Sequence, residues 1–178
     1  MTIEVRDAHA GEYVAIGEIV TAAFAADGQL GTDGSTPYAA VLRDVAGRAA
    51  HAQIIAALDG GVVVGGVTFV PHGGPMADLA REGEAEIRML GVAPDAQGRG
   101  AGTALVRECL ARATVPRPVG AGAGTPPGER GTRRVVLSTN TIAHGSHRLY
   151  ERLGFVREPA RDWTPVPGVD LLCYVLEL

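Results

Sequence analysis

The order of apolar and polar residues along the chain predicts strands and helices in mixed succession. Short extended apolar runs are typical of strands, whereas apolar residues that recur at helical spacing predict amphipathic helices. Strands are predicted at residues 3–6, 53–58, 62–70, 84–92, 134–139, 155–157 and 171–178. Helices are predicted at residues 11–26, 37–48, 102–113 and 146–153. This order predicts a mixed α/β (α+β) fold, with helices on both faces of a mostly antiparallel sheet of about seven strands.

Turn signals refine this picture at two places. Asp59-Gly60-Gly61 separates two apolar runs and predicts a tight hairpin. Gly91 interrupts the 84–92 strand, which leaves two interpretations open: a β-bulge, or close packing against another element.

The length of the chain predicts one domain, spanning residues 1–178. Within it, residues 115–131 are rich in proline and glycine, and we predict a flexible insertion with no direct chemical role. The apolar final strand either completes the core or contacts a second copy of the chain. A homodimer is therefore one of two expectations.

Composition narrows the class of protein. With 46% hydrophobic and 20% charged residues, the chain is typical of a globular domain. A net charge of −4 and the lack of any basic run argue against a nucleic-acid partner. The run at 62–70 is too short to cross a bilayer and no secretion signal is visible, so a cytoplasmic protein without membrane association is expected. Cys109 and Cys173 are interpreted as buried small apolar residues, and no ligand spacing predicts a metal site.

The most informative stretch is the turn at residues 97–102, Gln-Gly-Arg-Gly-Ala-Gly, between a predicted strand and a predicted helix. The first amides of a helix have no partner of their own, and with the positive end of the helix dipole they favour an anion. Glycines allow the positive φ that a nest of amides requires. The spacing matches neither the P-loop nor G-x-G-x-x-G. The turn indicates either a phosphate-bearing ligand or a tight connection chosen for packing.

Two motifs resemble one known family, the Gcn5-related N-acetyltransferases (GNAT). Residues 97–102 resemble its Gln/Arg-x-x-Gly-x-Gly/Ala signature. Further along, the family's Leu-Tyr-x-x-x-Gly-Phe element resembles Leu149-Tyr150-Glu151-Arg152-Leu153-Gly154-Phe155. The motifs stand in the family's order, and the resemblance covers nearly the whole chain.

This resemblance implies a GNAT-type acyl-CoA N-acyltransferase fold, whose fourth and fifth strands splay apart to admit the pantetheine arm of acetyl-CoA. Backbone amides of the glycine-rich turn, with the Arg99 guanidinium, would hold the pyrophosphate. The cofactor-binding residues implied are Leu90, Gly91, Val92, Gln97, Gly98, Arg99, Gly100, Ala101, Gly102 and Thr103. Tyr150 is implied as the general acid that protonates the departing sulfur, the alternative being a tyrosine that only packs in the core.

The general base is open among several groups. Glu86 stands four residues before Leu90, so the two side chains are expected to share a face, and members of the family often use a glutamate on this strand. Glu84 and a water molecule are alternatives. The remaining alternatives for the base are three histidines, His72, His144 and His147, and no spacing in the sequence selects one of them.

Two residues near Tyr150 depart from the family's pattern. Many members carry an asparagine seven residues before the tyrosine, where this chain has Ala143, and Asn140 comes three residues too early. Ser146 either contacts the cofactor or starts the helix as its N-cap.

The function implied is direct transfer of an acetyl group from acetyl-CoA to a primary amine in a ternary complex. A small-molecule amine acceptor is expected. The alternatives are a protein lysine or N-terminus, and a non-catalytic sensor of acyl-CoA. A cationic acceptor is suggested by the acidic residues Asp78, Glu82, Glu84 and Glu86.

Overall fold

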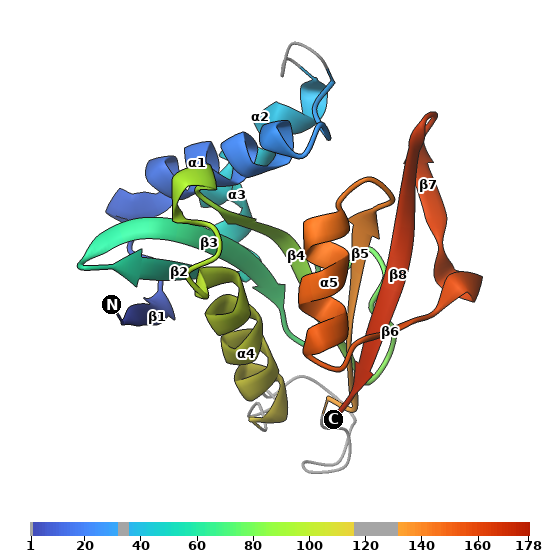
Figure 1. Cartoon of the computed structure of the whole chain (residues 1–178). Helices are drawn as coiled ribbons and strands as arrows, with labels where there is room; N and C mark the ends of the chain where they lie inside the picture. The colour runs from blue at the N-terminus through green and yellow to red at the C-terminus, as the bar shows by residue number, and fades with distance from the viewer. Residues whose placement is uncertain (1, 32–35, 116–131) are drawn as a thin grey trace.

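All strands of the computed structural model, which describes residues 2–31, 36–115 and 132–178, lie in one sheet (Figure 1). They are β1 (Ile3–Asp7), β2 (Gln53–Asp59), β3 (Val62–Val70), β4 (Glu84–Val92), β5 (Arg134–Asn140), β6 (Val156–Arg157), β7 (Trp163–Val166) and β8 (Val169–Glu177). Their order is β1-β2-β3-β4-β5-β8-β6, with β7 paired to β8. Only β4 and β5 are parallel neighbours, so the predicted mostly antiparallel sheet is confirmed. Residues 116–131 of the predicted insertion lie outside the described residues.

Helices cover both faces of this sheet, as the sequence predicts (Figure 1). They are α1 (Tyr13–Ala26), α2 (Pro37–Arg43), α3 (Val45–Ala49), α4 (Ala101–Thr114) and α5 (His144–Arg152). Short 3-10 turns occupy Ala10–Glu12, Pro94–Ala96 and Pro159–Arg161. On one face Val20 of α1 and Leu42 of α2 share a core cluster with Met89. On the other, Leu105 of α4 packs in a cluster with Ile87. Because β4 contributes to both clusters, it is buried on both sides.

The predicted helix over 37–48 is wrong in one respect, because it is broken at Asp44. Asp44 has ψ 63, outside the helical range, and its side chain accepts a hydrogen bond from the Gly47 N–H at 2.9 Å as the N-cap of α3. The Arg48 guanidinium then donates to the Leu42 carbonyl at 2.9 Å, which gives a hydrogen-bond partner to a carbonyl at the C-terminus of α2. Aspartate competes locally with the helix backbone, and the break follows from that preference.

The strand β7 is the element that the sequence analysis missed. It carries Pro165, which has no N–H to donate to a ladder, and it pairs with β8 alone. β8 is paired on both sides, to β5 and to β6 and β7, and it buries Cys173 and Tyr174. The final strand therefore completes the core.

The parallel pair β4 and β5 is short. Residues 84–87 pair with residues 134–137, after which β4 continues beside β3 and β5 continues beside β8. A bulge accompanies the separation, because Thr68 pairs with Arg88 and Gly66 with Gly91, leaving one extra residue on β4. Met89, within the bulge, has φ 51.

The bulge corrects one expectation about side-chain direction. One extra residue reverses the alternation of β4, so Leu90 packs against the cluster that contains Ile87. Glu86 lies on the face opposite Ile87, next to the amides of residues 78–80. The expectation that Glu86 and Leu90 share a face is therefore wrong.

Gly91 lies beside the bulge and packs closely against α1. A Cβ at this position would be 2.8 Å from the Val20 Cα and 3.2 Å from the Ala23 Cβ. Of the two interpretations that the sequence leaves open, the structure favours close packing for Gly91, with the bulge itself at Met89.

Replacing Gly91 by alanine tests this contact. The added methyl would push α1 from β4, and we expect a loss of about 1–3 kcal/mol in the free energy of unfolding. Gly145→Ala in α5 is the matched control, because a Cβ there meets nothing within 4 Å and alanine favours the helix. Urea unfolding measures both variants, and equal stabilities would contradict the close packing of Gly91.

Candidate functional site

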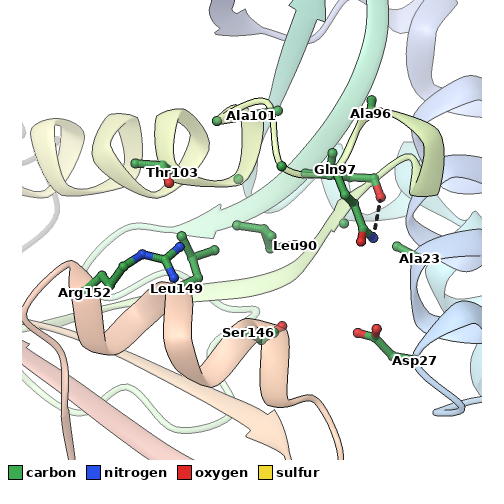
Figure 2. A pocket seen from close by; sticks show the side chains of 16 residues that line it. Ala23, Asp27, Leu90, Ala96, Gln97, Ala101, Thr103, Ser146, Leu149 and Arg152 are labelled. Carbon is green, nitrogen blue, oxygen red and sulfur yellow. Dashed lines mark hydrogen bonds between the residues drawn. The ribbon is translucent and has the colours of Figure 1, made fainter.

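A cavity of about 300 Å³ lies where β4 has separated from β5 (Figure 2). One side is the end of β4 that has no partner on the β5 side, with Leu90, Gly91 and Val92. A second side is the turn between β4 and α4 together with the first turn of α4. A third is α5, which contributes Ser146, Leu149 and Arg152. The separation of two strands thus opens a cleft whose walls are largely backbone.

The glycine-rich turn has the geometry of an anion cradle. Gly98 has φ 76 and Gly100 has φ 92, and Gly100 is the N-cap of α4 with no side-chain cap. The helix's first backbone bond runs from the Ala104 N–H to the Gly100 carbonyl at 2.9 Å, so the amides of residues 101–103 have no intrahelical partner. These amides and the positive end of the α4 dipole favour a negatively charged group at this edge of the cavity.

The predicted cradle residues do not all line the cavity. Its lining includes Gln97, Gly98 and residues 100–103, but not Arg99. The Arg99 guanidinium instead donates to the Asp95 carbonyl at 3.0 Å and lies 3.5 Å from the Asp59 carboxylate. The cation at this cavity is Arg152 of α5, a residue that the sequence analysis did not select although it stands within the second motif.

A second, larger cavity of about 600 Å³ adjoins the first. It lies between α1 and α2 on one side and β7 and β8 on the other, which are well separated in Figure 1. Aromatic and aliphatic side chains make up much of its wall, and its charged residues are Asp27, Asp78, Glu86 and Arg88. Tyr150 lines it, and Ala23, Asp27, Leu90 and Ser146 line both cavities.

Tyr150 packs in the core and lines the larger cavity. Only 6% of the residue is exposed, and its ring packs 5.8 Å from that of Phe155 and 6.2 Å from that of Tyr174. Burial raises the pKa of the phenol well above its ordinary value, so the hydroxyl stays protonated. A buried phenol with a fixed ring is a proton donor of defined position.

Glu86 is a buried carboxylate at the wall of the larger cavity. It is 2% exposed, and its Oε2 accepts hydrogen bonds from three backbone amides, those of Asp78, Leu79 and Ala80, at 2.9–3.0 Å. Its Oε1 lies 3.9 Å from the Arg88 Nε. Burial raises the pKa of Glu86 above its ordinary value, despite these hydrogen bonds.

The other candidates for a base lie outside both cavities. Glu84 forms a buried ion pair with Arg161 at 3.0 Å; burial raises its pKa, but the hydrogen bonds from Arg161 and from the Arg81 N–H outweigh this and lower it. His72 accepts from the Gly83 N–H at 3.0 Å. His147 lies 2.9 Å from the Asn140 carbonyl, and His144 packs against its ring. None of these four lines a cavity.

Two residues near the second motif are placed by the structure. α5 begins at His144 after Ala143, so Ser146 is not its N-cap, and it lines both cavities instead. Asn140 lines the larger cavity, although its side chain accepts from the Ile142 N–H at 3.2 Å.

Cys109 and Cys173 are free and buried, as predicted. Among the described residues, no group of three or more His, Cys, Asp and Glu side chains has the arrangement of a metal site. The same part of the chain contains no helix with the length and apolar character needed to cross a membrane.

Comparison with known proteins points to one family. A sequence model described as an acetyltransferase (GNAT) domain matches residues 50–157. A search of curated proteins finds no match.

Solved structures agree over the whole chain. A GNAT-family protein from Desulfovibrio desulfuricans is 23% identical, with a TM-score of 0.67 and 99% of each chain covered. The PaiA N-acetyltransferase of Thermoplasma acidophilum, solved in complex with coenzyme A, is 14% identical, with a TM-score of 0.66 and all of both chains covered. The yncA protein of Salmonella typhimurium, solved with its cofactor acetyl-CoA, is 20% identical, with a TM-score of 0.61, 100% of this chain and 95% of that one covered. At these identities the likeness concerns the fold.

The hydrogen bonds of Glu86 lead to a stability prediction. Glu86→Ala would leave three buried amides without an acceptor, and we expect the free energy of unfolding to fall by about 2–5 kcal/mol. Glu86→Gln keeps one oxygen for the amides and should lose much less. Urea unfolding measures the stability of both variants, and hydrogen exchange measures the protection of the amides of residues 78–80. Equal losses of stability in Glu86→Ala and Glu86→Gln would show that Glu86 does not anchor this segment.

Proposed function

Because the chain belongs to the GNAT acetyltransferase family, we propose that it transfers an acetyl group from acetyl-CoA to a primary amine of a small molecule, directly within a ternary complex. The observation that carries the proposal is that the two cavities adjoin and share lining residues. The anion cradle and the strand separation form one cavity, and this shares four lining residues with a larger one lined by Tyr150 and Glu86. A cofactor site and an acceptor site that meet suit direct transfer.

The smaller cavity supports the cofactor assignment. The pyrophosphate of acetyl-CoA would accept hydrogen bonds from the amides of residues 97–103, with Arg152 as the nearby cation. The pantetheine arm would pair with the edge of β4 that faces away from β3, at Leu90, Gly91 and Val92, where β5 has moved away. The thioester would then lie at the junction of the two cavities.

The reaction joins the amine nitrogen to the thioester carbonyl carbon and breaks the C–S bond. The acceptor's ammonium must first lose a proton, and the departing thiolate must gain one. Tyr150 is proposed as the acid, because its hydroxyl stays protonated and the residue lines the larger cavity. Glu86 is proposed as the base through Oε1, directly or by way of water, because its Oε2 is bound to three amides. A raised pKa makes this carboxylate a better proton acceptor.

The larger cavity favours a small acceptor over a protein. A volume of about 600 Å³ is within the range of small-molecule sites, and residues of α1, α2, β7 and β8 line the cavity. Acetylation of a protein lysine or N-terminus would give turnover with peptides instead. A non-catalytic sensor would bind acetyl-CoA and release no thiol with any amine.

Tyr150→Phe and Glu86→Gln test the proposed transfer, measured as thiol release from acetyl-CoA across a panel of primary amines and peptides. Tyr150→Phe should lower kcat by about 100-fold, with acetyl-CoA affinity unchanged. In the wild type the rate should rise with pH through the pKa of Glu86, because only the carboxylate accepts a proton. Glu86→Gln should lack this rise. Unchanged kcat in either variant would remove that residue from the mechanism.

Gly100→Glu tests the cradle. A glutamate at φ 92 is strained, and it brings a negative charge to the site proposed for the pyrophosphate. We expect acetyl-CoA affinity to fall at least about tenfold. Gly61→Glu is the matched control, since Gly61 has φ 83 in the β2–β3 turn, away from both cavities. Unaltered affinity in Gly100→Glu, measured by calorimetry, would refute the cradle.

A further inference from the structure

Asp27 stands where the two cavities meet. It lines both, together with Ala23, Leu90 and Ser146, and it is the only charged residue of these four. In Figure 2 its carboxylate points from the end of α1 into the cavity, toward the side of α5 that carries Ser146. A carboxylate at this junction lies next to the position proposed for the thioester.

Among the described residues, no cation pairs with Asp27. Within the described residues its carboxylate accepts a hydrogen bond only from the neutral side-chain amide of Gln29, at 3.3 Å. The other charges of the larger cavity already have partners: Arg88 pairs with Asp78, and Glu86 accepts three amides. Asp27 is therefore the carboxylate of this cavity that is available to a cation.

The position of Asp27 at the end of α1 makes the electrostatic potential at the junction of the two cavities more negative. Asp27 is the C-cap of this 14-residue helix, whose C-terminus carries the negative end of the helix dipole. An acidic side chain is unfavourable at that end, and a bound cation removes the penalty. Helix end and carboxylate together favour a positively charged group at the junction.

Next to this charge the cavity wall is aromatic. Phe24 stands three residues before Asp27 on α1, and its ring centroid is 6.1 Å from that of Tyr38 on α2. Across the cavity, β7 contributes Trp163, Pro165 and Val166. A ligand whose cation reaches Asp27 would place its body between these surfaces, where burial of apolar area stabilises it.

We propose that the acceptor is a primary alkylammonium compound with an aromatic or similarly bulky apolar body, and that Asp27 binds its ammonium group beside the thioester. This inference rests on the proposed function. Asp27 is the substrate-binding carboxylate, and the proton that the ammonium loses goes to Glu86 or water, as described above.

Binding to the coenzyme A-loaded protein, measured by calorimetry at neutral pH, tests this assignment. The probes are 2-phenylethylamine, its uncharged counterpart 2-phenylethanol, and n-butylamine, which keeps the charge but has no ring. We expect 2-phenylethylamine to bind at least about tenfold more tightly than either of the other two.

Asp27→Asn keeps the shape of the side chain and removes its charge. In this variant the affinity for 2-phenylethylamine should fall about tenfold, while that for 2-phenylethanol stays unchanged. Glu18→Gln is the control, because Glu18 is an exposed carboxylate on the same helix that lines neither cavity. It should change neither affinity.

Three results would overturn the assignment: no binding of 2-phenylethylamine, equal affinity for the amine and the alcohol, or an amine affinity that Asp27→Asn leaves unchanged. If coenzyme A itself fails to bind in the loading step, the proposed function fails as well. If coenzyme A binds and the amine shows no dependence on charge, only the assignment of Asp27 fails.

Discussion

The site depends on one constraint, that β4 and β5 stay paired for only four residues. Beyond Ile87 the inner edge of β4 has no strand beside it, and unpaired backbone is costly unless another group satisfies it. The bulge at Met89 turns the strand, Gly91 lets α1 pack closely against it, and α5 lies across the opening. The result is an internal sheet edge that can pair with a ligand instead of a strand.

A network of buried polar groups holds the wall of the larger cavity. Glu84 pairs with Arg161, which lies in the connection between β6 and β7, and the same carboxylate accepts the Arg81 N–H at 2.9 Å. Two positions further along β4, Glu86 accepts hydrogen bonds from the backbone amides of residues 78–80. Buried carboxylates are stable only when they are bonded in this way. Glu86 therefore combines a structural role through Oε2 with the proposed chemical role through Oε1.

Much of the fold and part of the site follow from local sequence signals. The hairpin at Asp59-Gly60-Gly61 was predictable because Gly60 and Gly61 both adopt positive φ, which few other residues tolerate. The cradle was predictable because glycines and a helix start coincide. The strand β7 and the bulge at Met89 were not predictable, since each is decided by partners far away in sequence. The break at Asp44 was missed although its signal, an aspartate that caps the next helix, is local. The positions of Arg152 and Asp27 at one cavity were not predictable either, because they lie on different helices that meet only in the fold.

The central claim is that the separated strands and the glycine-rich turn together form an acetyl-CoA site. Calorimetric titration with acetyl-CoA and, in parallel, with ADP tests it most directly, because ADP carries the pyrophosphate but no pantetheine arm. We expect both to bind and acetyl-CoA to bind far more tightly, since only its arm can pair with β4 at Leu90 to Val92. Equal affinities, or no binding of acetyl-CoA, would contradict it.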